Sequence, residues 1–247
     1  MSEAVRIAMW SGPRNISTAM MRSFENRPDT SVVDEPFYAC YLAATGAAHP
    51  MREEVLASQS TDWRVVAKAM TGSVPEGRAV FYQKHMTHHM LPAIGLEWTA
   101  RLRNAFLIRA PEDVLLSYHE VRGQATLDDI GVAQQRALFE READRLGHAP
   151  PVIDSQDVLG DPRGVLGALC VALGIAFSER MLSWPAGRRA SDGVWAPAWY
   201  GSVERSTGFS APRARARADT LSDDLRRVAD AARGDYERLA AFRLTRS

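Results

Sequence analysis

The sequence has little cysteine and no long apolar run. Its 247 residues include only Cys40 and Cys170, whereas a disulfide framework in a secreted domain needs more pairs. Both lie in apolar segments, so we expect reduced, buried thiols. No apolar stretch approaches the roughly 20 residues that a membrane-spanning helix needs, and the N-terminus lacks a signal-peptide pattern. These absences predict a soluble, cytoplasmic protein that has no membrane partner.

The sequence also lacks an excess of charge of either sign. It contains 30 basic and 30 acidic residues, and its formal net charge is zero. Because nucleic acids and anionic membranes attract basic surfaces, this balance gives no support for a nucleic-acid partner. Any anion-binding site must therefore be local. No linker, change of composition or internal repeat divides the chain, so we expect residues 1–247 to form one domain.

Short apolar runs alternate with longer amphipathic segments, and this pattern predicts an α/β fold with a parallel sheet and crossover helices. We expect strands at 5–10, 31–33, 79–83, 104–108 and 152–154. Helices are expected after the first strand and near 111–122, 126–146, 161–173 and 220–239. Residues 184–217 lack a regular pattern and are rich in Gly, Pro and aromatic residues, which predicts an irregular lid loop.

The segment between the first strand and its helix, WSGPRNISTAM from Trp10, has the composition of an anion-binding loop. Its backbone amides would point outward at the start of the helix, where the helix dipole attracts anions. Arg14 adds a guanidinium, and Ser17 and Thr18 add hydroxyls. The loop lacks the Gly-Lys-Ser/Thr ending of ATP- and GTP-binding loops. The alternative is an ordinary turn in which Ser17 and Thr18 only cap the helix. The predicted ligand-binding residues of the loop are Gly12, Pro13, Arg14, Asn15, Ile16, Ser17 and Thr18.

A second candidate segment is FLIRAPEDVLLSY, residues 106–118. Arg109 follows a predicted strand at its carboxyl end, which is where ligands of open α/β sheets bind. Ser117 lies on the helix that leaves the same edge. The alternative is that Arg109 pairs with Glu112 or Asp113 and supports the helix.

These segments resemble those of P-loop sulfotransferases. SGPRNIST looks like the family's 5′-phosphosulfate loop, P-[KR]-S-G-T, although Asn15 and Ile16 stand where Ser and Gly are usual. LIRAPEDVLLSY is similar to the 3′-phosphate motif, R-x-P-x-D-x-x-x-S. Residues 152–177, VIDSQDVLGDPRGVLGALCVALGIAF, resemble a third region in the family's order. The resemblance implies a three-layer fold like that of P-loop NTPases.

The resemblance also implies a donor, 3′-phosphoadenosine 5′-phosphosulfate, and a small-molecule acceptor with a hydroxyl or amine. Residues 14–18 would hold the 5′-phosphosulfate, with Arg14 stabilising the charge on the leaving phosphate oxygen. Arg109 and Ser117 would hold the 3′-phosphate, and Arg205 in the irregular loop could reach it. No metal is needed in this chemistry.

Two residues are candidates for the base that accepts the acceptor's proton. Glu35 follows the second strand, and some sulfotransferases use a glutamate that resembles it; Phe37 and Tyr38 could desolvate it. His85 follows the third strand, where cytosolic sulfotransferases have a Lys-x-His stretch. We favour Glu35. Two alternatives exist for the carboxylates: Asp34 and Glu35 only cap a solvent-exposed turn, or they hold magnesium. The alternative for the histidines is that His85 and His89 bind a metal.

Two other functions remain open at this point. A P-loop transferase of another kind, such as a small-molecule kinase, would use the Asp34–Glu35 pair and magnesium. A nucleotide-binding module that has lost catalysis would explain the departure from the family loop at Asn15 and Ile16. Magnesium-dependent ATP turnover would identify the kinase, and nucleotide binding without sulfated product would identify the inactive module.

Overall fold

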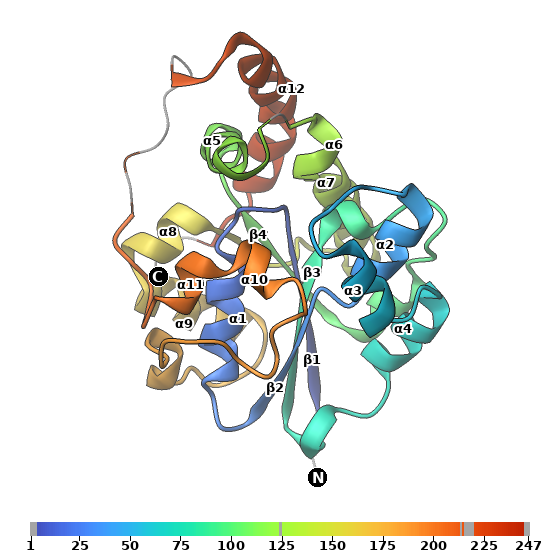
Figure 1. The fold of residues 1–247 in the computed structure, drawn as a ribbon. Coiled ribbons are helices and arrows are strands. Elements are labelled where there is room, and N and C mark those ends of the chain that lie inside the picture. The colour runs from blue at the N-terminus through green and yellow to red at the C-terminus, as the bar shows by residue number, and fades with distance from the viewer. Residues whose placement is uncertain (1–3, 124, 213, 215–219, 245–247) are drawn as a thin grey trace.

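The computed structural model describes residues 4–123, 125–212, 214 and 220–244. A five-stranded parallel sheet runs through the centre, in the order β2-β3-β1-β4-β5 (Figure 1). The strands are β1 Val5–Ser11, β2 Thr30–Asp34, β3 Val80–Met86, β4 Arg103–Ile108 and β5 Val152–Asp154. All five predicted strands are confirmed, although β3 is longer at its carboxyl end than the pattern indicated.

Helices connect the strands and cover both faces of the sheet. They are α1 Ser17–Glu25, α2 Tyr38–Thr45, α3 Arg52–Ser58, α4 Trp63–Thr71, α5 Pro111–Arg122, α6 Leu127–Ile130, α7 Val132–Leu146, α8 Ser155–Gly160, α9 Pro162–Ala172, α10 Ala196–Trp199, α11 Gly201–Glu204 and α12 Asp223–Ala240. Asp161 caps α9 by accepting a hydrogen bond from the Gly164 amide at 3.0 Å, and Pro162 takes the first helical position.

The helix expected at 126–146 is divided into α6 and α7 by Gly131. This residue has a φ of 64°, in the left-handed region that glycine adopts without strain. A Cβ atom here would lie 2.9 Å from Oγ1 of Thr87 and 3.0 Å from the backbone nitrogen of His88. Only glycine therefore allows the α6–α7 junction to approach the end of β3 this closely.

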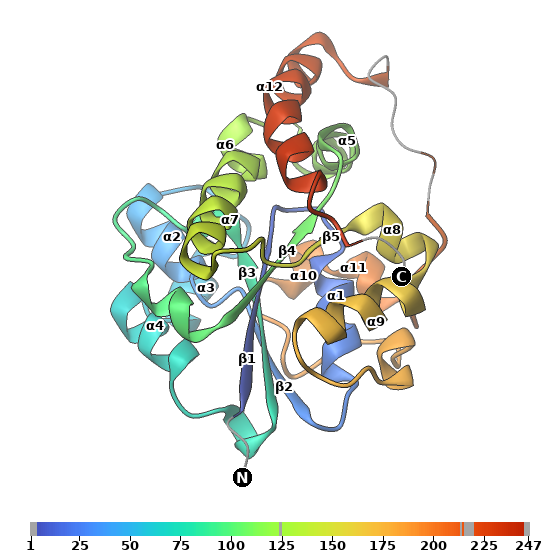
Figure 2. The ribbon, with the colours of Figure 1, turned by 180° about the vertical axis from the view of Figure 1, so that it is seen from behind.

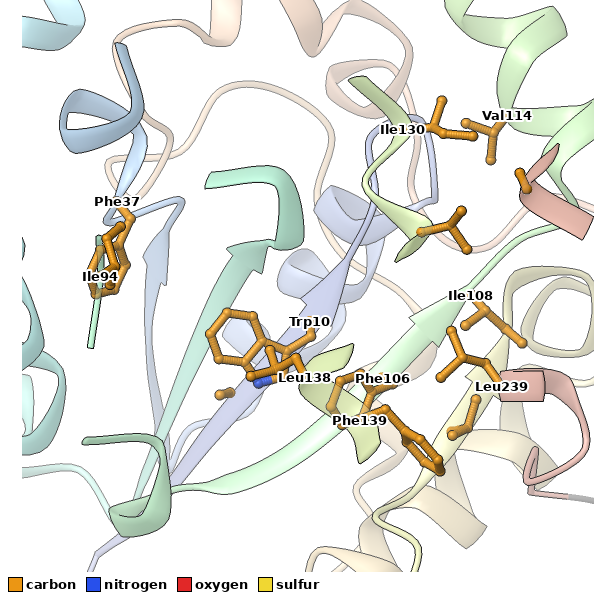
Figure 3. Close-up of a cluster of buried hydrophobic side chains, with 14 of the residues drawn as sticks. Trp10, Phe37, Ile94, Phe106, Ile108, Val114, Ile130, Leu138, Phe139 and Leu239 are labelled. Atoms are coloured by element: carbon orange, nitrogen blue, oxygen red, sulfur yellow. The ribbon is translucent and has the colours of Figure 1, made fainter. Parts of the chain in front are cut away.

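The sheet separates two hydrophobic cores, so the molecule has three layers (Figure 2). Alternate residues of β1 face opposite sides, as in any strand. Ala8 and Trp10 pack with α4, α5, α7 and α12, and Figure 3 shows part of this core around Trp10 and Phe139. Ile7 and Met9 pack with α1 and α9 on the other face. The structure thus confirms the predicted three-layer α/β fold.

Both cysteines are free and buried, as expected. Among the residues that the structure describes, no helix combines the length and the apolar character that crossing a membrane would require.

Candidate active site

A cavity of about 310 Å³ lies at the carboxyl ends of the central strands. The sheet order sets the sequence of functional groups along this edge. Glu35 follows β2, Lys84 lies on β3, the 12–16 loop follows β1 and Arg109 follows β4. All four elements contribute to the cavity lining. The topology therefore brings the two predicted phosphate-binding segments and one candidate base to a single site.

Two residues of the loop after β1 have left-handed backbone conformations, Arg14 with φ 56° and Ile16 with φ 43°. Such a conformation is rare for a β-branched residue. Ile16 stands where the sulfotransferase loop pattern has glycine, so the chain retains a glycine-like backbone despite the different side chain. The side chain of Asn15 is buried and donates from Nδ2 to the carbonyl of Leu107 at 2.6 Å. This bond fixes the loop to β4.

Gly12 does not line the cavity, but the loop depends on it. A Cβ atom at this position would lie 2.4 Å from the carbonyl oxygen of Ile130. A side chain at this position would therefore clash with the α6–α7 junction. Pro13 and the residues that follow it, from Arg14 to Thr18, do line the cavity.

Ser17 is the first residue of α1, and Ile16, at the N-cap position, makes no side-chain cap. Neither the Ser17 nor the Thr18 hydroxyl bonds to another side chain or backbone group of the described chain. The capping alternative is therefore not supported, and both hydroxyls belong to residues that line the cavity.

The two cationic side chains predicted to bind phosphates lie at the same end of the cavity. Arg14 donates from Nε to the Ser117 hydroxyl at 3.1 Å, and Arg109 donates from Nη1 to the backbone carbonyl of Arg14 at 2.5 Å. Glu112, one of the alternative partners of Arg109, pairs instead with Arg233 of α12 at 2.6 Å. The loop and the β4–α5 segment thus form one positively charged end.

A buried polar network centres on Lys84. Its ammonium donates to Oδ1 of Asp34 at 2.9 Å, to Oε1 of Glu35 at 2.7 Å and to the Tyr200 hydroxyl at 2.6 Å. Since an ammonium has three N–H donors, each is used. Tyr200 in turn donates to Oδ2 of Asp34 at 2.6 Å and accepts from Nε1 of Trp195 at 3.1 Å. Lys84 therefore positions Glu35 and has no donor left for a ligand.

Burial sets the protonation of this network. Burial raises the pKa of Glu35 above its usual value, and although the charge of Lys84 opposes the rise, the charge of Asp34 adds to it. Burial alone would lower the pKa of Lys84, but the charges of Asp34 and Glu35 hold it well above its usual value. Lys84 is thus cationic at neutral pH. Glu35 has a higher proton affinity than an exposed glutamate, and its left-handed backbone, with φ 39°, is the kind of strain found at functional sites.

His85 is not at the site, and its candidacy as the base has no support in this geometry. Neighbouring residues of a strand point to opposite faces, and His85 faces away from the cavity that Lys84 lines. Its ring stacks on Trp10 at a centroid distance of 4.5 Å, and its Nε2 lies 3.1 Å from Oε1 of Gln83. Burial lowers the pKa of this imidazole to about 3, so His85 is a core residue.

The region predicted as an irregular lid contains two short helices, α10 and α11, and one wall of the cavity. Its residues 213 and 215–217 lie outside the described part of the chain. Of its aromatic residues, Trp184 is buried elsewhere against Phe209, at a centroid distance of 5.1 Å. The cavity is lined by Trp195, Trp199, Tyr200 and Phe209.

Arg205, expected to reach the 3′-phosphate, is exposed and does not line the cavity. The short helix α11 ends at Glu204 and turns the next side chain outward, whereas Val203 and Ser206 on either side line the cavity. The structure therefore does not bring Arg205 to the positively charged end.

Sequence reasoning missed most of the far end of the cavity. This part is lined by Tyr38 and Tyr41 of α2, by His49, and by His88 and His89 of the 3₁₀ turn Thr87–His89. None of these residues belongs to a motif with fixed spacing. His85 and His89, considered together as metal ligands, lie on a strand and a turn rather than on one helix. Within the described ranges, no three His, Cys, Asp or Glu side chains are grouped so that they could hold a metal ion.

Comparison with solved structures identifies the fold. The mouse sulfotransferase SULT7A1 complexed with PAP has a TM-score of 0.54 and 12% identity, covering 96% of this chain and 86% of that one. A sulfotransferase from Alicyclobacillus acidocaldarius has a TM-score of 0.54 and 14% identity, covering 99% and 98%. The sulfotransferase domain from the curacin biosynthetic pathway has a TM-score of 0.53 and 16% identity, covering 93% and 98%.

Comparison with curated proteins gives relatives that are longer than this chain. Branched-chain-amino-acid aminotransferase-like protein 1 of Arabidopsis thaliana is 39% identical over 223 residues, which are 90% of this chain and 40% of that protein. Its paralogue, protein 2, is 33% identical over 207 residues, or 84% and 36%. The chain thus spans about two fifths of the length of these relatives. The family model for the sulfotransferase domain matches residues 5–236, and the chain belongs to this sulfotransferase domain family.

Proposed function

We propose that the protein is a sulfotransferase that uses 3′-phosphoadenosine 5′-phosphosulfate and modifies a hydroxyl or amine of a small molecule. The observation that carries this proposal is the placement of two kinds of groups in one cavity. Arg14, Arg109 and Ser117 form an anion-binding end. Glu35, with its raised pKa, lies two strands away along the same edge.

The residues at the positively charged end fit the donor. A 3′-phosphate and a 5′-phosphosulfate each favour a cationic partner, and Arg14 and Arg109 lie at one end of the cavity, with Arg109 donating to the Arg14 carbonyl. Left-handed conformations at Arg14 and Ile16 turn successive backbone amides toward one side, as in an anion-binding nest. Arg14 and residues 15–18 would hold the 5′ end, and Arg109 and Ser117 the 3′-phosphate. When bound, this donor supplies the sulfuryl group.

The side chains of the chain then act on protons and charge. Glu35 accepts the proton of the acceptor hydroxyl or ammonium as its oxygen or nitrogen becomes the nucleophile. Arg14 stabilises the negative charge that grows on the phosphate oxygen, and preorganised donors of this kind lower barriers by about 3 kcal/mol each. Lys84 holds the Glu35 carboxylate in place through its 2.7 Å hydrogen bond.

The network of Lys84 bears on the kinase alternative. A magnesium ion at Asp34 and Glu35 would need their carboxylate oxygens, yet one oxygen of each carboxylate already accepts a hydrogen bond from the Lys84 ammonium. This arrangement favours sulfuryl transfer over a magnesium-dependent reaction. The inactive-module alternative rests on Asn15 and Ile16, and the glycine-like backbone at Ile16 weakens it.

The direct test incubates the purified protein with 3′-phosphoadenosine 5′-phosphosulfate and a panel of alcohols, phenols and amines. Formation of adenosine 3′,5′-bisphosphate that depends on the acceptor supports the proposal, and we expect EDTA to leave it unchanged. Turnover of ATP that requires magnesium would support the kinase instead. Binding of the bisphosphate without transfer to any compound would support the inactive module.

A further inference from the structure

The far end of the cavity, which we name the acceptor end, is built from aromatic rings and imidazoles. It is lined by Tyr38, Tyr41, His49, His88, His89, Trp195 and Trp199. It lies on the β2 and β3 side of the sheet edge, beyond Glu35 and Lys84, whereas Arg14 and Arg109 follow β1 and β4. A molecule bound there would therefore reach Glu35 from the side opposite the anion-binding end.

The rings of the acceptor end pack against one another. His89 stacks on Tyr38 at a centroid distance of 4.7 Å with 13° between the planes, and on Tyr41 at 4.9 Å with 27°. His88 meets Tyr41 edge-on at 5.3 Å. Trp195 packs edge-on against Tyr38 at 5.1 Å from the lid side. Ring walls of this kind favour a planar guest, because aromatic rings gain energy from stacked and edge-to-face contacts beyond their buried area.

His88 and His89 supply polar groups that the described chain leaves unused. Nδ1 of each is buried and has no hydrogen-bond partner, and neither imidazole bonds to any other described side chain or carbonyl. Each neutral imidazole carries one N–H donor and one acceptor nitrogen. Buried polar groups in proteins are almost always paired, so two unpaired imidazoles in the lining of one cavity indicate a ligand that pairs with them.

The two imidazoles of the Thr87–His89 turn give the acceptor end no positive charge. Burial lowers the pKa of His88 to about 3, with His49 lowering it further and Asp129 opposing. Burial also holds the pKa of His89 well below its usual value, and the nearby His88, His49 and Lys84 add to this effect. Asp129 bonds to the amide and hydroxyl of Thr126 at 2.8 and 2.7 Å. Both imidazoles are therefore neutral at neutral pH.

We infer that the acceptor is a planar, uncharged aromatic alcohol that carries a second uncharged polar group, bound among these rings and hydrogen-bonded by His88 and His89. This inference rests on the proposed function, and it names the substrate class of the same site. A carboxylate in place of the second polar group would lack a partner of opposite charge at this end, since the one lysine among the described lining residues, Lys84, is fully bonded to Asp34, Glu35 and Tyr200. A saturated ring of the same size would lose the flat contacts.

The test measures direct binding by calorimetry at pH 7, with and without adenosine 3′,5′-bisphosphate. The probe is methyl 4-hydroxybenzoate. Its charge control is 4-hydroxybenzoate, and its shape control is methyl 4-hydroxycyclohexanecarboxylate. We expect the probe to bind at least about tenfold more tightly than either control, since one lost hydrogen bond or stacked ring corresponds to about that factor. Equal affinities, tighter binding of the carboxylate, or no binding of the probe would overturn the inference.

Variants locate the binding. His88→Phe and His89→Phe keep a flat ring and remove the nitrogen atoms, so each should weaken probe binding by about tenfold while leaving bisphosphate affinity unchanged. The matched control is His148→Phe, at an exposed position outside the cavity, which should change neither. If both cavity variants bind the probe like the wild type, the assignment of the histidines is wrong. If the bisphosphate binds and the probe does not, this inference alone is wrong. If the bisphosphate does not bind, the proposed function is wrong.

Discussion

Tyr200 lies 2.6 Å from the ammonium of Lys84, although 116 residues separate them in the sequence. The same hydroxyl donates to Asp34, so the loop after Trp184 is bonded to the ends of β2 and β3. We expect Tyr200→Phe to lower the free energy of unfolding by about 1–3 kcal/mol, because it leaves two buried charged groups each short of one partner. Turnover should fall as well, since Lys84 positions Glu35.

Tyr82→Phe is the matched control. Tyr82 is fully buried, and its hydroxyl has no partner in the described chain, so its removal should be neutral or slightly stabilising. Denaturant unfolding and single-turnover rates, measured for both variants, provide the test. Equal stability of the two variants would show that the Tyr200 bonds contribute nothing.

Glu35→Gln tests the base. This change keeps the size of the side chain and removes its proton affinity, so turnover should fall by about 10²- to 10⁴-fold while bisphosphate affinity is retained. Arg14→Ala should reduce both turnover and bisphosphate affinity, because Arg14 is at the anion-binding end. Near wild-type turnover in the glutamine variant would show that another group takes the proton.

The pH dependence follows from the raised pKa of Glu35. The base acts only when ionised, so kcat should rise with pH through a midpoint above the usual value of 4.5. Stability has the opposite sign: since the folded state binds this proton more tightly, the contribution of Glu35 is fully present below pH 4.5 and is lost as the pH rises through the raised pKa. Glu35→Gln should flatten both trends, whereas an unchanged kcat profile would contradict the assignment.

The comparison of Lys84 with His85 shows where sequence reasoning reached its limit. The five strands were predictable because their apolar runs are short and bounded by helix signals. The third strand was expected to end at residue 83, yet β3 continues to Met86. Strand alternation could therefore not be applied to Lys84 and His85, and the pattern could not decide which of them faces the ligand. The contact between Lys84 and Tyr200 has no local signal.

Crossover helices were predicted, but no bounds were given for those between β2 and β3, and α2 shows why. α2 is short and apolar on most faces, and its N-cap residue, Phe37, makes no side-chain cap. Neither periodicity nor a cap therefore marks its start. Since α2 carries Tyr38 and Tyr41, the acceptor end could not be assembled from the sequence, whereas the anion-binding end lay in two recognisable motifs.

Arg109→Ala tests the 3′-phosphate site. In the wild type, adenosine 3′,5′-bisphosphate at a hundredfold excess over its dissociation constant should stabilise the fold by about 2.7 kcal/mol. AMP at the same concentration should stabilise it less. In the variant the two nucleotides should have similar effects, because the extra phosphate loses its guanidinium. Thermal unfolding with each nucleotide measures this. Equal shifts in the wild-type protein would contradict the 3′-phosphate assignment.

The loop that forms one cavity wall is also anchored by a buried ion pair. Arg22 of α1 donates to Oδ2 of Asp192 at 2.7 Å, and the exposed fractions of the two side chains are 0% and 1%. Asp192→Ala would leave the guanidinium buried with Glu25, at 3.4 Å, as its one acidic partner among the described residues. We expect a loss of about 3 kcal/mol in the free energy of unfolding, at the low end of the range for a broken buried pair, because the buried guanidinium keeps only the longer contact with Glu25.

Two further variants test whether the loss of stability comes from the unpaired charge and from its burial. Arg22→Met combined with Asp192→Leu removes both charges, so it should cost less than Asp192→Ala alone. Asp224→Ala breaks an exposed pair with Arg227, whose side chains are 67% and 77% accessible, and should change stability by less than about 0.5 kcal/mol. Denaturant unfolding of the three variants decides the point. If Asp192→Ala costs no more than Asp224→Ala, the pair does not anchor the loop, and the wall of the cavity is held by the bonds of Tyr200 to Asp34 and Lys84.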